Sequence, residues 1–318
     1  MGPRVTVIIC TRDRPQPLEQ CLGALRAQRY RNFDVLVVDN GAGDSAAEVC
    51  RSHGVACIRE AIPGLTRARN LGARAARGEL VAYIDDDAIA EPQWLEALVT
   101  EFQDPRVGAV AGRTRYMKAA GDPLVMSDQD ARGEVEPRPR RRFDRDVDGW
   151  FALACFGGIG DGNTMMFRRE LLTSVVRFDE RIGRGRAIDS GDEHIAFMSL
   201  ISDGFHVVHA PAAVVRHPVP SAIDGRQAKR FRDLRGSIAY FLFVWSQFPN
   251  HRVDVVRFLA SRLTRRVRSK PERRVAPLTV SQTLSAVSAG RRLYADAVRE
   301  WAAAPSSGAP MARVVTLR

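Results

Sequence analysis

The chain lacks the cysteine patterns and long apolar runs that mark several classes of protein. Its 318 residues include five cysteines but no CxxC pair, so neither a zinc site nor a disulfide framework is expected. The aromatic-rich run Ile238–Trp245 is too short to span a bilayer, which needs ~20 apolar residues. The N-terminus opens on the strand-like Val5–Cys10 without a signal-peptide pattern. These absences predict an intracellular, cytoplasmic protein.

An excess of positive charge is also missing from the first two thirds of the chain. Residues 1–220 hold 29 basic against 31 acidic side chains, whereas residues 221–318 hold 19 against 6. The basic segment also carries aromatic residues and the helically spaced Val253, Val256 and Leu259. It suits contact with an anionic membrane surface, peripheral to the inner face, but equally a helical appendage with solvated arginines. No nucleic-acid motif accompanies the charge, so no nucleic-acid partner is expected.

Strand-like and helix-like segments alternate through the first half. The expected strands are Val5–Cys10, Phe33–Val38, Val55–Arg59, Leu80–Ile84 and Val107–Ala111, and the expected intervening helices cover residues 18–25, 44–53, 65–77 and 92–102. This alternation predicts an α/β fold with a mostly parallel sheet, in which ligands gather at the carboxyl ends of the strands. We expect residues 1–220 to form this domain, with a mobile loop at about 117–149, and residues 221–318 to form a helical extension.

Three consecutive carboxylates, Asp85, Asp86 and Asp87, directly follow the apolar run VAYI. Adjacent carboxylates repel one another at neutral pH, so a cleft-bound triplet is plausible chiefly where a divalent cation or a metal-bound phosphate neutralises it. Capping of a following helix explains one carboxylate but not three. The triplet therefore predicts a metal and nucleotide site.

An ordered set of motifs extends from residue 4 to residue 217. It comprises VTVIICTRDRP, FDVLVVDNGAGD, GLTRARNLGARAARGELVAYIDDDA, GNTMMFRREL, RFDERIG and SGDEHIAFMSLISDGFHVVHAPAAVVRH. In order and spacing this set resembles the family 2 glycosyltransferases, which have a Rossmann-like GT-A fold. The resemblance implies transfer of a sugar, with inversion, from a nucleotide-sugar to an acceptor hydroxyl, assisted by Mn²⁺ or Mg²⁺. A UDP- or dTDP-sugar is the expected donor, and a lipid-linked glycan, a polysaccharide or a small natural product is compatible as acceptor.

The resemblance also implies which residues bind the donor. Thr11, with Arg12 and Asp13 after it, stands where the family's first loop packs on the nucleobase. Asp39 matches the acid that accepts a base N–H, a role that suits the imide of uracil or thymine. Arg69 matches an arginine that reaches the nucleotide. For Thr11 and Asp39 the alternative is ordinary turn formation at a strand end, and for Arg69 it is a solvated helix arginine.

The family's DxD pattern assigns Asp87 to the metal and Asp85 or Asp86 to the ribose and the sugar, with Asp85 a further candidate ligand. A metal held there would take up charge as the nucleoside diphosphate leaves. His217 matches a histidine that closes the catalytic domain and sometimes adds to the metal shell. A structural role after a strand is its alternative.

A second acidic pair, Asp192 and Glu193, falls where the family carries its catalytic base. By register Glu193 is the predicted base and Asp192 the close alternative, although acids are also favoured at any helix N-terminus. The glycine-rich segment containing Gly162 and Asn163 matches an acceptor-side loop, which a plain connection between strands would also explain. Trp150 could stack on a sugar or belong to the core.

Three other functions fit the sequence less well. A sugar-nucleotide pyrophosphorylase should carry a glycine-rich basic loop after its first strand, where this chain reads TRDRP. A non-catalytic relative that still binds nucleotide-sugars is disfavoured because the acids and Arg69 are all present. A nucleic-acid-binding protein with a basic tail would show salt-dependent DNA retention without sugar-nucleotide binding.

Overall fold

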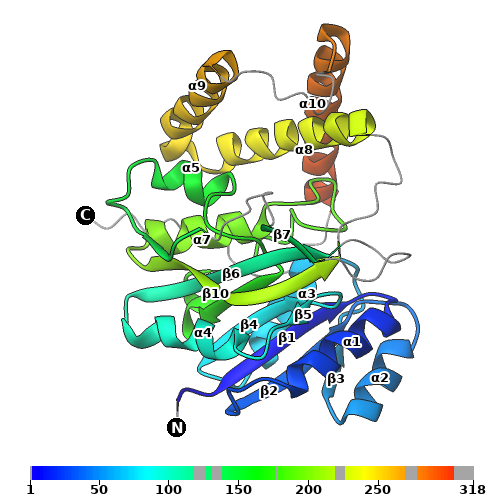
Figure 1. The fold of residues 1–318 in the computed structure, drawn as a ribbon. Helices are drawn as coiled ribbons and strands as arrows, with labels where there is room; N and C mark the ends of the chain where they lie inside the picture. Colours follow the sequence, from blue (N-terminus) through cyan, green and yellow to red (C-terminus); the bar gives the residue numbers. More distant parts are fainter. Residues whose placement is uncertain are drawn as a thin grey trace. The chain divides into compact units, whose positions relative to one another are not determined.

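The computed structural model describes residues 2–117, 126–130, 138–176, 178–218, 226–268 and 278–303 (Figure 1). These described residues divide into two compact units. The first contains residues up to 180 together with those from 192 to 218. The second contains residues 181–191 and the described residues beyond 225.

Within the described residues of the first unit, ten strands form one sheet. Its main path runs β3-β2-β1-β4-β9-β6-β10-β5, with β7 beside β6 and β8 beside β10. The strands are β1 (Val5–Thr11), β2 (Phe33–Asp39), β3 (Ala56–Arg59), β4 (Leu80–Asp85), β5 (Ile89–Ala90), β6 (Val107–Met117), β7 (Met126–Asp130), β8 (Arg141–Phe143), β9 (Thr164–Arg168) and β10 (His206–Pro218). Strands β1, β2, β3, β4, β6 and β10 share one direction, and the others run against it. The predicted α/β class with a mostly parallel sheet is confirmed.

Helices connect the strands and flank the sheet (Figure 1). They are α1 (Pro15–Arg26), α2 (Ser45–His53), α3 (Leu65–Ala75), α4 (Trp94–Thr100), the 3₁₀ turn η1 (Glu101–Gln103), α5 (Trp150–Cys155), α6 (Arg169–Ser174) and α7 (Asp192–Ser202). The apolar positions predicted for the first helix, Leu18, Cys21, Leu22 and Leu25, are its buried side chains. They pack in one cluster with β1 and with Trp94, Leu95 and Leu98 of α4.

The register of the central strands brings the predicted polar positions to one edge of the sheet. Strand β1 lies between β2 and β4, with Thr11 opposite Asp39 and Cys10 opposite Asp85. Because parallel strands end at the same edge, the first three predicted loops share that edge.

Two predicted helix boundaries are wrong. Helix α3 ends at Ala75 rather than Arg77, because the backbone N–H groups of Arg77 and Gly78 donate to the Thr6 hydroxyl on β1. A Cβ on Gly78 would lie 2.5 Å from the Thr6 backbone nitrogen, so the glycine allows the chain to approach β1 closely. Helix α4 begins at Trp94, two residues after Pro92, and its last turn is the 3₁₀ segment η1.

The segment predicted to be an irregular loop, residues 117–149, contains regular structure. Strand β7 pairs with β6, and β8 pairs with β10. Pairing partners distant in the chain supply this structure, which is why local periodicity did not reveal it. Residues 118–125 and 131–137 lie outside the described residues, so the predicted mobility of the loop stays a prediction.

The second unit is helical, as expected for the extension. It contains α8 (Arg226–Gln247), the 3₁₀ turn η2 (Pro249–His251), α9 (Arg252–Arg268), α10 (Val280–Ala303) and residues 181–191. Phe243 and Val244 of α8 are buried, as are Ala286 and Ala297 of α10. Gly290 permits close packing, since its Cβ would lie 2.7 Å from the Arg235 carbonyl oxygen. Among the described helices, none has both the length and the hydropathy that a membrane crossing requires.

Candidate active site

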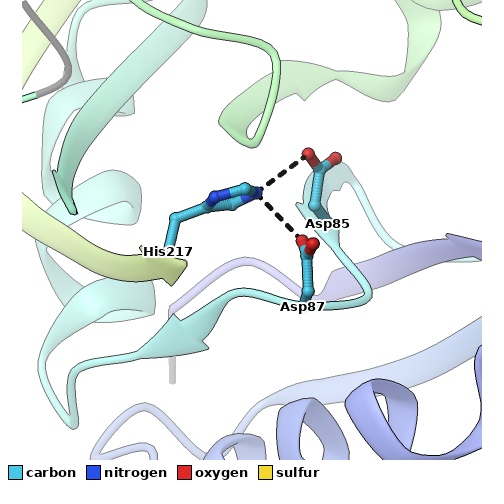
Figure 2. A group of neighbouring side chains, drawn as sticks. All are labelled: Asp85, Asp87 and His217. Atoms are coloured by element: carbon cyan, nitrogen blue, oxygen red, sulfur yellow. Dashed lines mark ion pairs between the residues drawn. The ribbon is translucent and has the colours of Figure 1, made fainter. Parts of the chain in front are cut away.

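Two aspartates at the end of β4 meet a histidine near the end of β10. The His217 Nε2 atom lies 2.9 Å from Asp87 Oδ1 and 3.7 Å from Asp85 Oδ2 (Figure 2). One potential ligand atom from each of the three residues fits within a 4.8 Å span. Carboxylate oxygens and an imidazole nitrogen are a donor set that Mn²⁺ accepts, and carboxylates suit Mg²⁺. These three predicted residues therefore fit a divalent cation.

Cationic side chains of the protein neutralise this acidic cluster. Arg14 donates to Asp86 Oδ1 and to Asp87 Oδ2, each at 2.7 Å. Burial would raise the pKa of Asp87, but His217 and Arg14 hold it well below its usual range. Burial lowers the pKa of His217, but its contacts with Asp85 and Asp87 outweigh burial and raise it to about 10. Asp87 is thus held ionised.

Arg14 was missed by the sequence reasoning, which singled out Arg12 and Asp13 in the same loop. Arg12 is exposed, and the Asp13 carboxylate instead accepts the Ala42 backbone N–H at 3.1 Å. Asp13 has a positive φ of 54°, so the loop turns sharply there, ahead of Arg14. The signal available was an arginine directly before the proline that opens α1, three residues after the strand end.

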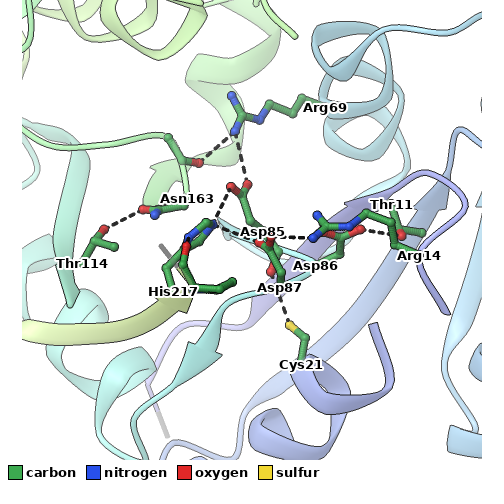
Figure 3. A network of polar contacts seen from close by, with 12 residues as sticks. Thr11, Arg14, Cys21, Arg69, Asp85, Asp86, Asp87, Thr114, Asn163 and His217 are labelled. Atoms are coloured by element: carbon green, nitrogen blue, oxygen red, sulfur yellow. Dashed lines mark hydrogen bonds and ion pairs between the residues drawn. The ribbon is translucent and has the colours of Figure 1, made fainter. Parts of the chain in front are cut away.

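Asp86 turns toward Thr11 and Arg14 rather than toward His217 (Figure 3). The Thr11 hydroxyl donates to Asp86 Oδ2 at 2.7 Å. Burial raises the pKa of Asp86 to about 6, although Thr11 and Arg14 act in the opposite direction. The three adjacent aspartates therefore occupy two environments, with Asp85 and Asp87 in the group around His217 that could hold a cation and Asp86 outside that group.

Two consecutive buried polar residues, Asp39 and Asn40, hold the end of β2 through separate hydrogen bonds. The Asp39 carboxylate accepts the Gly41 backbone N–H at 2.9 Å. The neighbouring Asn40 side chain donates to the carbonyls of Glu60 and Ile62 and accepts the Gly64 N–H. Asn40 therefore ties the end of β2 to the entry of α3, the helix that carries the predicted arginine. Sequence reasoning did not single it out, although it directly follows the strand-ending aspartate.

Arg69 of α3 joins the two acidic groups. Its Nη1 lies 2.5 Å from Asp192 Oδ2, and its Nη2 lies 3.8 Å from Asp85 Oδ1. Nη2 also donates to the Gly162 carbonyl oxygen at 2.8 Å, and the guanidinium lies 5.5 Å from the centre of the Phe178 ring. Arg69 and Asp192 are both buried, and a buried charge needs such partners. One guanidinium thus links the strand-end aspartates to the acidic start of α7.

The two acids at the start of α7 differ in their partners. Asp192 is paired with Arg69, whereas Glu193 Oε1 lies 3.7 Å from His194 Nε2. A Cβ on Gly162 would stand 3.4 Å from the Glu193 carboxyl carbon, so this carboxylate borders the acceptor-side loop. Burial and the adjacent Asp192 raise the pKa of Glu193 to about 8, against the charge of Arg69. Its proton affinity is therefore close to what a base operating near neutral pH requires.

The residues predicted for the acceptor side make different kinds of contact. Gly162 contacts Arg69 directly, and the neighbouring Asn163 accepts a hydrogen bond from the Thr114 hydroxyl of β6 at 2.8 Å (Figure 3). Trp150 packs edge-on against Phe151 within α5, with ring centres 5.9 Å apart. The acceptor role predicted for Trp150 therefore has no support in this contact and stays a prediction.

Comparison with known families and proteins gives a consistent result. The family model described as glycosyl transferase family 2 matches residues 6–175, more than half of the chain. Glycosyltransferase AglE of Haloferax volcanii is 32% identical over 36% of this chain and 40% of its own length. An N-acetylglucosaminyltransferase of Sinorhizobium fredii is 25% identical over 78% of this chain and 60% of its own length. The chain thus spans about half the length of these curated relatives.

Solved structures share the fold. A mannosyltransferase of Pyrobaculum calidifontis, PcManGT, solved in complex with GDP-Man and Mn²⁺, has a TM-score of 0.55 and 22% identity over 96% of this chain and 77% of its own. S. aureus TarS, as residues 1–349, has a TM-score of 0.51 and 15% identity over 75% of this chain and 65% of its own. These likenesses establish a common fold.

Proposed function

The chain belongs to glycosyl transferase family 2, and from that premise we propose that it is a metal-dependent inverting glycosyltransferase. It would move a sugar from a nucleotide-sugar to an acceptor hydroxyl. The observation that carries the proposal is the position of Arg69, which contacts both Asp85 and Asp192. The residues that hold the cation and the residue that acts as catalytic base can act on one substrate only if they share a site. The contacts of Arg69 with Asp85 and Asp192 are consistent with a shared site.

Asp85, Asp87 and His217 would hold Mn²⁺ or Mg²⁺, and His217 would give up its ring proton as the cation binds, because only a neutral imidazole can be a metal ligand. Bound there, the cation supplies Lewis-acid stabilisation of the departing diphosphate. Arg14 supplements that charge, since its guanidinium bridges Asp86 and Asp87 and its planar fork can exchange a carboxylate for a phosphate oxygen. PcManGT is solved with GDP-Man and Mn²⁺. By analogy, this chain would take the same type of donor, a nucleotide-sugar, together with a divalent cation.

Asp39 and the loop after Thr11 would bind the nucleoside. A carboxylate at the end of β2 accepts an imide N–H, which favours a UDP- or dTDP-sugar. GDP-sugars belong in any test because of the PcManGT complex.

Glu193 would act as the base. Asp192 forms an ion pair with Arg69, whereas Glu193 lies beside Gly162 and has a raised pKa. By removing the acceptor proton as the oxygen attacks the anomeric carbon opposite the leaving diphosphate, Glu193 would produce inversion in a single displacement.

A panel of UDP-, dTDP- and GDP-sugars tests the proposal through thermal stabilisation with Mn²⁺, because a ligand that binds only the native state raises apparent stability. We expect one donor to stabilise the wild-type chain, EDTA to abolish the effect, and Asp87→Ala to show no metal-dependent effect. Glu193→Gln should bind donor normally and lose transfer. Normal transfer by Glu193→Gln would make Asp192 the base. A chain that binds donor but never releases nucleoside diphosphate would be a non-catalytic relative.

The second unit would contact an anionic membrane surface. Val253, Val256 and Leu259, here called the α9 apolar face, are 61%, 52% and 39% exposed. Arg252 and Arg257 lie on the same helix, and the segment beyond residue 220 is strongly basic. Exposed apolar side chains beside arginines are typical of interfacial helices. A lipid-linked acceptor would then be presented at the same surface.

A further inference from the structure

The segment that leads into the proposed base folds with the second unit. Residues 181–191, here called the base-entry loop, group with α8, α9 and α10, whereas Asp192 belongs to the first unit. The loop closes on itself through a bridge between Ile182 and Ile188, both fully buried, and through the Gly183 N–H, which donates to the Ile188 carbonyl at 2.8 Å. Its last residue, Gly191, is bonded covalently to Asp192, so the chain path into α7 starts from this loop.

The first residue of the base-entry loop is held by two helices. The Arg181 carbonyl accepts the indole N–H of Trp301 of α10 at 3.1 Å, and the Arg181 guanidinium donates to Gln247 of α8 at 2.7 Å. The guanidinium also lies 5.2 Å from the centre of the Phe243 ring and 5.3 Å from that of Trp301. A cation between two aromatic rings is attracted to both faces. Arg181 is thus fixed through its backbone and its side chain.

The rest of the loop is held by the same helices. Arg186 forms an ion pair with Glu300 of α10 at 3.2 Å. Gly191 has a φ of +93°, and a Cβ there would lie 2.3 Å from the Tyr240 ring of α8. Because of this ring contact and the positive φ, any side chain at position 191 would shift the backbone there, directly before Asp192.

We infer that the helical extension positions the catalytic base. Helices α8 and α10 hold the base-entry loop, and the loop fixes the chain entering α7, which carries Glu193. The inference rests on the proposed role of Glu193. Arg181 and Trp301 are positioning residues, since they act through the loop and contact no reacting group. Donor-binding residues such as Asp39 and Asp87 stand elsewhere in the sequence, so loosening the loop should slow transfer and leave donor binding intact.

Substitutions at Trp301 in the full-length chain test the inference. Trp301→Ala removes both the ring and the indole N–H, Trp301→Phe keeps a ring, and Val298→Ala is the control on an exposed position of the same helix. Hydrogen exchange over residues 182–195 reports on the loop without requiring activity. A misplacement of about 1 Å can cost ~100-fold in rate. We expect Trp301→Ala to lower kcat at least about tenfold and to speed exchange in residues 182–195, with the donor dissociation constant within about twofold of wild type.

We expect an intermediate result for Trp301→Phe and wild-type behaviour for Val298→Ala. Unchanged exchange and unchanged kcat in Trp301→Ala would overturn the inference. So would an equal loss of donor binding, because that result would show general destabilisation. If the wild-type chain transfers no sugar, the proposed function fails. Faster hydrogen exchange in residues 182–195 of Trp301→Ala would even then show that α10 holds the loop.

A charge swap keeps the test valid if Trp301→Ala does not fold. Arg186→Glu and Glu300→Arg each break the ion pair, and the double variant restores it in reverse. We expect the single variants to lower kcat about two- to fivefold and the double variant to recover most of that loss. Singles equal to wild type, or no recovery in the double variant, would contradict the inference.

Discussion

At the scale of single residues, Arg69 pairs with acids from two separate parts of the chain, Asp85 and Asp192. Its guanidinium is buried against Asp192, Asp85 and the Gly162 carbonyl. Removing one member of a buried pair leaves the other charge uncompensated, at a cost of about 3–5 kcal/mol. We therefore expect Arg69→Met to lower the free energy of unfolding by about that amount in chemical denaturation.

The double variant Arg69→Met, Asp192→Asn is the matched control. It removes both charges, so most of the lost stability should return. If the single and double variants are equally unstable, the loss comes from packing against Phe178 and not from an unpaired Asp192.

The pKa of Glu193 predicts how transfer depends on pH. A pKa of about 8 in the folded chain means that the carboxyl is largely protonated at pH 7. Since only the ionised form can act as a base, kcat/KM should rise as pH increases through about 8. A pH–rate profile with its rising limb near pH 5 would contradict this assignment.

The same shift affects stability. The pKa of Glu193 in the folded chain lies above the ordinary glutamate value of 4.5. The stabilisation that proton binding by Glu193 gives is therefore complete below about pH 4.5 and is lost as pH rises to about 8. Glu193→Gln should therefore flatten the fall of unfolding free energy across that interval. An identical pH dependence in wild type and Glu193→Gln, measured by denaturation at several pH values, would refute the shift.

Residue types with a distinctive chemistry were predictable from the sequence. The three residues that the sequence suggested for the metal, Asp85, Asp87 and His217, lie together in the structure. Arg14 and Asn40 were not predicted, because their positions beside Pro15 and Asp39 do not by themselves indicate which groups they contact. Their importance depends on partners 20 or more positions away in the chain, which only the folded chain supplies.

At the scale of elements, alternation of strand and helix sufficed to predict the parallel part of the sheet and the common edge at which β1, β2 and β4 end. Alternation could not reveal that β9 runs antiparallel between β4 and β6, nor that β7 and β8 pair at all. Short strands are selected by their neighbours in the sheet more than by their own sequence.

The end of α3 gives a prediction at this scale. Gly78→Ala would place a Cβ 2.5 Å from the Thr6 backbone nitrogen, and backbone cannot move aside as a flexible side chain can. We expect a loss of about 1–3 kcal/mol in unfolding free energy.

Gly23→Ala is the control, because Gly23 is an exposed helical glycine and an added Cβ would meet open space. That substitution should stabilise by about 0.5–1 kcal/mol. A Gly78→Ala variant as stable as wild type would show that the close approach to β1 is not required.

At the scale of the whole molecule, the two units differ in charge. The segment up to residue 220 has 29 basic and 31 acidic side chains and is close to neutral, while the segment after it has 19 and 6 and so carries the entire positive excess of the chain. A basic unit is attracted to an anionic surface over a Debye length of about 8 Å at physiological salt, and apolar burial adds a contribution that salt does not screen. Substrate chemistry and membrane contact would thus be assigned to different parts of one chain.

Vesicle binding tests this division. We expect the full-length chain to sediment with vesicles rich in phosphatidylserine and much less with neutral phosphatidylcholine vesicles, with binding weakened at high salt. Val256→Asp places a charge on the α9 apolar face and should lower partitioning at least about tenfold, which corresponds to ~1.4 kcal/mol. Leu284→Asp is the matched control, since Leu284 is 65% exposed on α10 of the same unit. Equal losses from both variants would show that contact is not specific to α9, and unchanged binding of Val256→Asp would exclude the α9 apolar face. Donor-induced thermal stabilisation should be the same in both variants, because neither position lies in the first unit, which contains the residues proposed to bind the donor.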